Sequence, residues 1–372
     1  MDLNNIKQIK RLDPQGMLDI VYKWPEFIED ALNTNIKIPQ QIQIQNQLIN
    51  YQNKVENILI CGMGGSAVSG DYLITYLENK INIPIFVRRN YSIPEFIDEQ
   101  TLTILISYSG NTEETISCLI EAIQRNTMIV GIASGGKLLE FFSKNNLPYF
   151  KIPGGMQPRA SFPLLLFPLL RILEEVGIYH LDNDVIKEIM KNIQAIREEC
   201  KLDIPTSDNP AKTIAKSLYK KIPVIWSPYK CVGNRIKCQF NENSKIQAFC
   251  EEIPEFNHNH IVGWESYTEE NPFVIFALRF PSEHPNVSLR FEISMEMIHN
   301  KVEIIEMSVK GSELLNQLIY ATYMGDYVSI YLSILNNVDP NTVQSIDYLK
   351  HEMELRNQTQ SNLFRTLDKL NL

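Results

Sequence analysis

Short apolar runs alternate along this chain with longer stretches whose apolar residues recur at helical spacing. In the first half, the runs are 56–61, 83–87, 102–106, 127–133 and 149–152, and they are rich in Ile, Val and Leu. Runs of this length and composition are typical of strands buried on both faces of a parallel sheet. The alternation predicts an α/β fold, in which helices cover both faces of the sheet.

The same alternation returns after residue 163. Strands are expected at 222–226, 273–278 and 302–307, and helices at 164–176, 185–200, 211–221, 234–250, 288–300, 312–337 and 341–370. Before the first strand, the pattern predicts a helix over 13–32 that is broken at Pro25, and a second helix over 39–53. The two halves are therefore expected to form two α/β layers.

A segment dense in turn residues separates the two halves. Residues 153–163 contain three prolines and two glycines, the strongest punctuation in the chain. A chain of 372 residues is also long enough for two domains of ordinary size. We therefore predict an N-terminal domain over residues 1–152 and a C-terminal domain over residues 153–372.

Composition narrows the possible functions. The protein is 44% hydrophobic and 21% charged, and no apolar run approaches the roughly 18 residues of a membrane span. Its net charge of −9 and scattered basic residues argue against nucleic acid as a partner. The N-terminus lacks the apolar core of a signal peptide. Six cysteines without a C-x-x-C pair indicate reduced, buried thiols in a cytoplasmic protein, and neither a disulfide framework nor a structural zinc site is expected.

The turn after the run 102–106 is crowded with hydroxyl groups. Ser107, Ser109 and Thr112 come between a predicted strand and a predicted helix. A helix N-terminus there presents unpaired N–H groups and a positive dipole end, which favour an anion. Glu113 and Glu114 follow in the first helical turn, where carboxylates mostly complement the dipole and face solvent.

A second turn of this kind follows the run 56–61. Gly62-Met-Gly-Gly-Ser66 lets the backbone approach a ligand closely, because glycine has no Cβ. It is neither a G-x-G-x-x-G fingerprint nor a P-loop, so dinucleotide and nucleoside triphosphate binding are disfavoured. Ligands of such sheets lie beyond the carboxyl ends of the strands. Ser66 is therefore expected to converge on one phosphate with the hydroxyls of the other turn.

Polar residues also gather in the second half, in Gln239-Phe-Asn-Glu-Asn-Ser-Lys245 and Glu252-Ile-Pro-Glu-Phe-Asn-His-Asn-His260. A lone histidine usually has a structural role, but two of the chain's six histidines fall in this second segment, beside carboxylates, which raises the chance of a role in proton transfer. His-x-His with Glu255 is also a possible metal site, but no third histidine or cysteine stands at ligand spacing. We therefore predict no metal.

The sequence context alone does not decide the roles of two basic residues. Arg159 lies in the proline-rich segment, where it either projects into a cleft or pairs with a carboxylate at the surface. Lys350 lies on the last predicted helix and is most simply part of a solvated face.

Taken together, these motifs resemble the bifunctional phosphoglucose/phosphomannose isomerases of the sugar isomerase (SIS) domain superfamily. The resemblance covers nearly the whole chain in the right order. It is carried by residues 62–67, 107–115, 158–161, 241–245 and 254–264, and by the segments 13–17 and 339–350 near the ends. Each motif alone is weak, whereas the ordered set is specific.

The resemblance implies two SIS domains, each a flavodoxin-like parallel sheet between helices. It implies interconversion of glucose 6-phosphate or mannose 6-phosphate with fructose 6-phosphate through an enediol, without metal or other cofactor, by a homodimer with shared active sites. The residues that match the family's site are the phosphate ligands Gly65, Ser66, Ser107, Ser109 and Thr112, the base Glu242, the ring-opening His258 contributed by the neighbouring subunit, the intermediate-stabilising Arg159, and the active-site Lys350.

The chemistry suits these residue types. A carboxylate can take the C2 proton and return it at C1, and a guanidinium can stabilise the enediol oxygens. The chain departs from the family at Ser244, usually Ala, and at His260, usually Glu. The residue associated with mannose-type substrates falls at Thr342 or Val343. Two alternatives are an isomerase of another phosphosugar, such as an amino sugar, and a phosphosugar-binding regulator without catalysis.

Overall fold

The computed structural model describes residues 2–268 and 270–370, which form two compact units. The five-stranded unit comprises Glu26–Leu181 and Val343–Leu372, and the four-stranded unit comprises Met1–Pro25 and Asp182–Thr342. The sequence placed the division at residues 152 and 153. In the structure the chain passes between the units after residues 25, 181 and 342. The middle crossing comes later than residue 153 because α7 (Pro163–Glu175) packs against α4 (Gly64–Leu77) in the five-stranded unit.

The five-stranded sheet is entirely parallel. Its order is β4 (Ile85–Arg88), β3 (Asn57–Cys61), β5 (Thr101–Ile106), β6 (Met128–Ala133) and β7 (Tyr149–Lys151). This is the 2-1-3-4-5 order of flavodoxin-like sheets, whose topological switch point lies between the first and third strands, here β3 and β5. Every residue of β5 and β6 is buried. The sequence prediction of a buried parallel sheet is confirmed.

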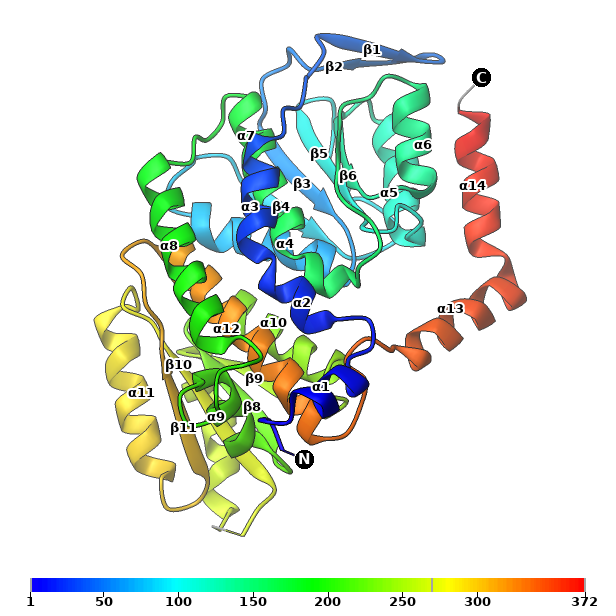
Figure 1. Ribbon diagram of the computed structural model, residues 1–372. Coiled ribbons are helices and arrows are strands. Elements are labelled where there is room, and N and C mark those ends of the chain that lie inside the picture. Colours follow the sequence, from blue (N-terminus) through cyan, green and yellow to red (C-terminus); the bar gives the residue numbers. More distant parts are fainter. Residues whose placement is uncertain (1, 269, 371–372) are drawn as a thin grey trace. The chain divides into compact units, whose positions relative to one another are not determined.

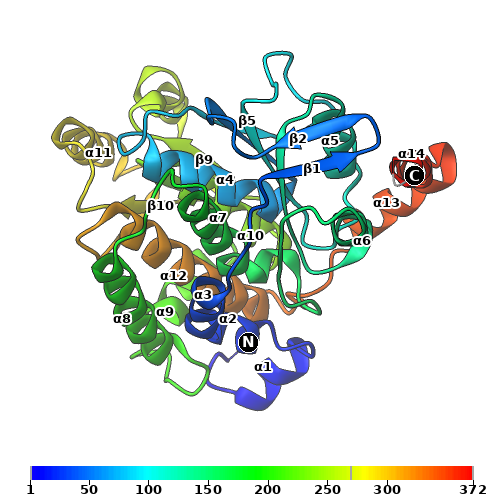
Figure 2. The ribbon, with the colours of Figure 1, turned by 90° about the horizontal axis from the view of Figure 1, so that it is seen from above.

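Helices cover both faces of this sheet (Figure 1). On one face, α5 (Glu113–Gln124) and α6 (Gly136–Lys144) share a core with Leu59 and Leu105. The C-terminal α14 (Thr359–Lys369) lies alongside these two helices and contributes Leu367 to that core (Figure 2). On the other face, α4 approaches Ile60 through Gly70.

The helix predicted over residues 39–53 is wrong. The segment forms an antiparallel hairpin of β1 (Gln41–Ile44) and β2 (Gln47–Asn50). Its Gln-Ile-Gln-Ile sequence has a period of two, and the two isoleucines are buried while the glutamines are exposed. The turn between the strands is made by Gln45, which adopts a left-handed φ of 51°. Period-two alternation favours a strand with one buried face.

Three further predictions differ at helix ends. The first predicted helix is three helices, α1 (Ile6–Leu12), α2 (Met17–Tyr22) and α3 (Trp24–Asn33), so the break precedes Pro25, which stands in the first turn of α3 where proline is tolerated. The predicted helix 234–250 is α10 (Lys230–Glu242) followed by the strand β9 (Phe249–Glu252). The predicted helix 341–370 is divided into α13 (Gln344–Asn357) and α14 by Gln358, whose φ of 50° is left-handed.

The four-stranded sheet is also parallel. Its order is β11 (Glu303–Ser308), β10 (Phe273–Arg279), β8 (Ile222–Ser227) and β9. With β8 as the first strand this is the order 2-1-3-4, the same as in the first four strands of the other sheet. The prediction of two α/β layers is thereby confirmed.

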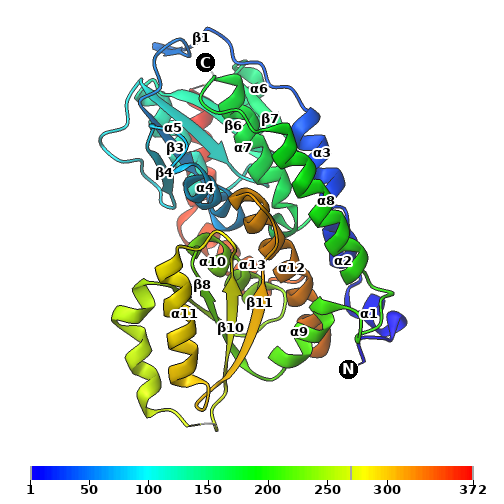
Figure 3. The same cartoon turned by 90° about the vertical axis from the view of Figure 1, so that its left-hand side faces the viewer.

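The two faces of the four-stranded sheet are covered by different elements. Trp226 and Ile275 point to a face covered by the 3₁₀ helices η2 (Glu255–His258) and η3 (His260–Ser266) and by α11 (Pro285–Ile298). Phe276 points to the other face, where its ring lies 6.4 Å from that of Phe240 in α10. Figure 3 shows α11 alongside the strands β8 and β10.

One helix forms the centre of the four-stranded unit. α12 (Leu314–Leu335) is buried almost throughout, and α8 (Asn183–Cys200), α9 (Pro210–Leu218), α10 and α2 pack around it. Asp326 on this helix forms a fully buried ion pair with Arg235, at 2.8 Å between Oδ2 and Nη2. Among the described helices, α12 included, none is long and apolar enough to cross a membrane. All six cysteines are free thiols, and Cys61, Cys118, Cys200 and Cys231 are buried.

Candidate active site

The switch point of the five-stranded sheet carries two helix N-termini. α4 begins just after β3 and α5 begins just after the β5 turn. Their N-cap residues, Met63 and Thr112, make no side-chain cap hydrogen bond. The first N–H groups of both helices therefore lack a capping acceptor from the preceding residue, and the two dipole ends favour an anion at the carboxyl edge of β3 and β5.

The hydroxyls of the 107–112 turn have unequal roles. The Ser107 side chain is buried, lies 2.8 Å from the Thr112 hydroxyl oxygen, and accepts a 3.0 Å hydrogen bond from the Gly110 N–H. Ser109 is exposed and accepts a 3.2 Å hydrogen bond from the Asn111 N–H. Ser107 thus holds the turn together, while Ser109 faces outward where a ligand can reach it.

A third turn, which the sequence reasoning missed, supports this one. Gly110 has a φ of 72°, and a Cβ placed on it would lie 1.8 Å from the carbonyl oxygen of Gly135, in the turn between β6 and α6. The Leu138 N–H donates to the Gly110 carbonyl at 2.9 Å, and the Lys137 N–H donates to Asn111 Oδ1 at 2.8 Å. The pair Gly135-Gly136, which follows a buried strand after the single residue Ser134, is the sequence signal that identifies this turn.

Arg159 lies beside the glycine loop. It belongs to η1 (Pro158–Ser161) and is 4% exposed, so the alternative of a surface arginine is wrong. A Cβ placed on Gly65 would lie 3.5 Å from the carbonyl oxygen of Pro158 and 3.8 Å from the Arg159 Cα. The Arg159 guanidinium donates to Gln157 Oε1 at 3.3 Å. Within the five-stranded unit, the predicted arginine and the predicted phosphate loop are neighbours.

Lys350, the other basic residue predicted for the site, lies on α13 in the five-stranded unit. Lys350 is exposed on α13, a helix in which no residue is buried. It is the next helix, α14, that reaches the turn, because Gln360 Nε2 donates to the Asn111 carbonyl at 2.8 Å. The structure therefore places Lys350 one helix away from the element that contacts the turn.

Glu242 is the last residue of α10 and is half-buried. The two residues that follow it are buried and anchor the chain to α12. Asn243 Nδ2 donates to Ser329 Oγ at 2.9 Å, and Ser244 Oγ donates to the Ser329 carbonyl at 2.6 Å. Ser244 thus makes a buried hydrogen bond that fixes the backbone next to the carboxylate.

His258 ends η2 and is exposed. Its neighbours fix the segment, since the ring of Phe256 lies 4.4 Å from that of Trp226 and Asn257 Nδ2 donates to Ser294 Oγ at 2.7 Å. His260 Nδ1 lies 3.0 Å from Glu251 Oε1. Among residues 2–268 and 270–370, no three histidine, cysteine or acidic side chains are grouped so that they could hold a metal ion.

Glu242 and His258 are kept apart within the four-stranded unit. α10 and the segment containing η2 cover opposite faces of the sheet. Glu242 and His258 also lie near different ends of the strands. The helix α10 starts at the carboxyl end of β8 and extends over 13 residues, about 20 Å, toward the amino end of the sheet. In contrast, η2 follows the carboxyl end of β9. The two residues of one copy therefore lie near opposite edges and on opposite faces.

The Glu113 carboxylate at the start of α5 has a hydrogen-bond partner in the five-stranded unit. Glu113 Oε2 accepts a 3.1 Å hydrogen bond from the Tyr91 hydroxyl. Burial raises the pKa of the Glu113 carboxyl above its ordinary value, and burial also raises the pKa of Tyr91 to about 12. Glu113 is thus less solvated than the sequence suggested, and its hydrogen bond ties the turn after β4 to α5.

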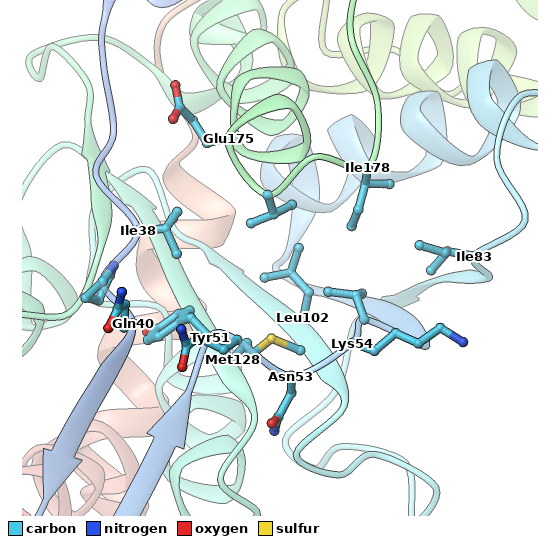
Figure 4. A pocket seen from close by; sticks show the side chains of 14 residues that line it. Ile38, Gln40, Tyr51, Asn53, Lys54, Ile83, Leu102, Met128, Glu175 and Ile178 are labelled. Atoms are coloured by element: carbon cyan, nitrogen blue, oxygen red, sulfur yellow. The ribbon is translucent and has the colours of Figure 1, made fainter.

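A pocket of about 520 Å³ lies elsewhere in the five-stranded unit (Figure 4). Leu102 and Met128, which line it, stand at the beginnings of β5 and β6, and Tyr51 lies beside Met128. It therefore opens at the amino edge of the sheet, opposite to the turns described above. No predicted site residue lines this pocket.

Comparison with known protein families places these features in a class. The SIS domain model matches residues 52–140, which contain both phosphate-type turns, and the model of the bacterial phospho-glucose isomerase C-terminal SIS domain matches residues 207–353. A hypothetical protein from Thermus thermophilus has the same fold, with a TM-score of 0.71 at 15% identity over 94% of this chain and 93% of that one. The fold and the turns thus define a protein of the SIS class.

The family within that class follows from closer relatives. The chain is 34% identical over 342 residues to a bifunctional phosphoglucose/phosphomannose isomerase from Caldicellulosiruptor bescii, covering 91% of this chain and 98% of the relative. It is also 34% identical over 303 residues to that of Aquifex aeolicus, covering 80% and 91%. The protein belongs to the bifunctional phosphoglucose/phosphomannose isomerase family.

Proposed function

We propose that the protein interconverts glucose 6-phosphate and mannose 6-phosphate with fructose 6-phosphate, without metal, as a cytoplasmic homodimer. The observation that carries this proposal is the pair of uncapped helix N-termini and hydroxyl-rich turns beside Arg159, in a chain that matches these isomerases over 91% of its length. The phosphate is held by the backbone of the Gly65 loop and by the hydroxyls of Ser66, Ser109 and Thr112. Ser107 shapes the turn for them.

The remaining residues have separate roles at the sugar. Glu242 takes the C2 proton and returns it at C1, and Arg159 stabilises the charge that develops on the enediol oxygens. His258 opens the ring by moving a proton between the anomeric hydroxyl and the ring oxygen. Lys350, on α13, is the remaining residue that we assign to the active site. Phosphate binding supplies anchoring remote from the reacting carbons.

The separation of Glu242 and His258 supports the sharing of sites between two copies. Proton transfer needs hydrogen-bond reach to the substrate, about 3 Å. Two side chains on opposite faces and opposite edges of one sheet do not both reach one small sugar. The His258 that serves a given Glu242 therefore comes from the neighbouring subunit.

The test is a pair of coupled assays started from fructose 6-phosphate with chelator present, one detecting glucose 6-phosphate and the other mannose 6-phosphate. Both products are expected. If neither product appeared, the proposed isomerase activity would be wrong. If chelation abolished the activity and zinc restored it, the proposal that the enzyme works without metal would be wrong. Parallel assays with amino-sugar phosphates address the alternative substrate class.

A variant tests the base. Glu242→Gln should abolish turnover while fructose 6-phosphate still raises the unfolding temperature, because the phosphate contacts remain. Glu265→Gln, an exposed carboxylate in the same unit, is the matched control and should keep full activity. A fully active Glu242→Gln protein would rule this residue out as the base, and a regulator without catalysis would bind the sugar phosphate in both variants with no turnover in either.

A further inference from the structure

The segment that leads to Arg159 lies outside the helices and strands. Residues 153–157 connect β7 to η1 and include Gly154 and Gly155, which are both exposed, the second with a left-handed φ of 86°. Glycine loses more conformational freedom on folding than any other residue, so such a segment needs contacts with its surroundings to keep one conformation. The place of Arg159 beside the glycine loop therefore depends on what anchors these residues.

Tyr108, in the turn after β5, supplies an anchor. Its hydroxyl oxygen accepts a 2.9 Å hydrogen bond from the Met156 N–H. Tyr108 is itself held in place, because it is 6% exposed and its carbonyl accepts from the Ser134 N–H at 2.9 Å and from the Ser134 hydroxyl at 2.6 Å. The segment also passes close to Ser134, since a Cβ placed on Gly154 would lie 3.6 Å from the Ser134 Cβ and Oγ. The anchor is thus fixed at its main chain as well as at its ring.

One residue connects this anchor to the Arg159 guanidinium. Gln157 directly follows Met156, and its Oε1 accepts from Arg159 Nη1 at 3.3 Å. The Gln157 carbonyl accepts from the Ala160 N–H at 2.9 Å, in the turn that forms η1. The hydrogen bond at Met156 therefore fixes the backbone next to the residue that contacts the guanidinium.

We propose that Tyr108 is a positioning residue, which holds Arg159 in place by tying residues 153–157 to the phosphate turn. Tyr108 stands between Ser107 and Ser109, so one turn both binds the phosphate and fixes the segment of the group that stabilises the enediol. Electrostatic stabilisation requires a preorganised donor, and a misplacement of about 1 Å can cost about a hundredfold in rate. The inference rests on the proposed function for the role of Arg159.

Tyr108→Phe tests the tie, because it removes the hydroxyl and keeps the ring and the carbonyl. In assays from fructose 6-phosphate, kcat should fall about tenfold or more, while KM stays within about threefold because the hydroxyls of the phosphate turn remain. Tyr51→Phe is the matched control. The Tyr51 hydroxyl donates to the Ile129 carbonyl at 2.6 Å in the same unit, beside the pocket at the amino edge of the sheet. This variant also loses one buried hydrogen bond but should keep the wild-type kcat and KM.

A double-variant cycle shows whether Tyr108 acts through Arg159. In an Arg159→Gln background, Tyr108→Phe should change kcat by less than about twofold, because the guanidinium that it positions is already gone. If Tyr108 instead contacted the sugar directly, the two losses would multiply, and the positioning role would be overturned. Circular dichroism of each variant confirms that a loss of activity is not unfolding.

Hydrogen exchange of residues 154–157 gives a readout that does not depend on activity. These amides should exchange about tenfold faster in Tyr108→Phe than in the wild-type protein or in Tyr51→Phe, because the Met156 N–H has lost its acceptor. Unchanged exchange, an unchanged kcat, or an equal loss of kcat in Tyr51→Phe overturns the positioning role in an active enzyme. A wild-type protein without isomerase activity removes the proposed function instead, and the exchange rates then decide whether Tyr108 holds the segment.

Discussion

Ser107 and Ser109 stand two residues apart in the same turn, yet the structure gives them different tasks, and their alanine variants should separate stability from binding. The Ser107 hydroxyl lies 2.8 Å from the Thr112 hydroxyl oxygen and accepts from the Gly110 N–H at 3.0 Å in a buried site. Ser107→Ala removes that oxygen, but the Gly110 N–H still donates to the Ser107 carbonyl at 3.0 Å, so the variant should cost about 0.5–1.5 kcal/mol of folding free energy. Ser109 is exposed, so Ser109→Ala should change stability by less than about 0.5 kcal/mol.

Substrate binding should be weakened more by Ser109→Ala than by Ser107→Ala. A hydrogen bond to a charged group contributes about 1.5–3 kcal/mol, so loss of the Ser109 contact to the phosphate should raise KM about tenfold to a hundredfold. kcat should change much less, because the phosphate is remote from the reacting carbons. Ser143→Ala, an exposed serine of α6 in the same unit, is the control and should change neither quantity.

The assay for stability must report on the correct unit. All three tryptophans, Trp24, Trp226 and Trp264, lie in the four-stranded unit, so their fluorescence does not follow the five-stranded one. Hydrogen exchange of the 107–112 backbone and of α5, with circular dichroism for global unfolding, is the suitable measurement. If Ser109→Ala destabilised the turn as much as Ser107→Ala, or if neither variant changed KM, the division of roles would be refuted.

Three further predictions follow from the packing. Asp326→Ala leaves Arg235 buried without its counter-ion and should lower the unfolding free energy by about 3–5 kcal/mol, followed by tryptophan fluorescence in that unit. Ser244→Ala removes the hydrogen bond to the Ser329 carbonyl and should cost about 0.5–1.5 kcal/mol with little change in kcat/KM. The hydrogen bond from Lys137 to Asp368 raises the pKa of Lys137 above its ordinary 10.5, so its contribution to α14 docking is complete below that pH and is lost as the pH rises through the folded pKa. Proteolysis of α14 should therefore increase at alkaline pH, and Lys137→Gln should remove that pH dependence.

Periodicity predicted the sheets well because buried parallel strands are short, apolar and bounded by turns. It failed over 39–53, where Gln-Ile-Gln-Ile has a strand period but lies in a glutamine-rich stretch that was assigned to a helix. It also missed β9, whose Phe249 and Cys250 continue the apolar pattern of α10. In both places the competing elements are short, and a few residues do not define a period.

The site was less predictable than the fold for a physical reason. Turns after adjacent strands of a parallel sheet must lie close together, so Ser66 and the 107–112 turn could be grouped from the sequence. Nothing in the spacing places Arg159, almost 100 residues after the glycine loop, beside Gly65, because that proximity depends on how α7 packs against α4. The task of Ser107 was likewise out of reach, since it depends on which hydroxyl of the turn is buried.

The two sheets share the strand order 2-1-3-4, yet only one has turns suited to a phosphate, and the reason can be found in the corresponding turn of the other. At the switch point between β8 and β10, Ser227-Pro-Tyr-Lys230 contains no glycine. The Tyr229 hydroxyl lies 2.8 Å from Ser282 Oγ, which itself donates to Gln317 Oε1 at 2.6 Å. These side chains satisfy one another's hydrogen-bonding groups. Because the turn contains no glycine, its side chains prevent the close approach of an anion to the backbone. The same topology thus supplies a turn that leads into an uncapped helix N-terminus in one unit, and a packed, self-satisfied turn in the other.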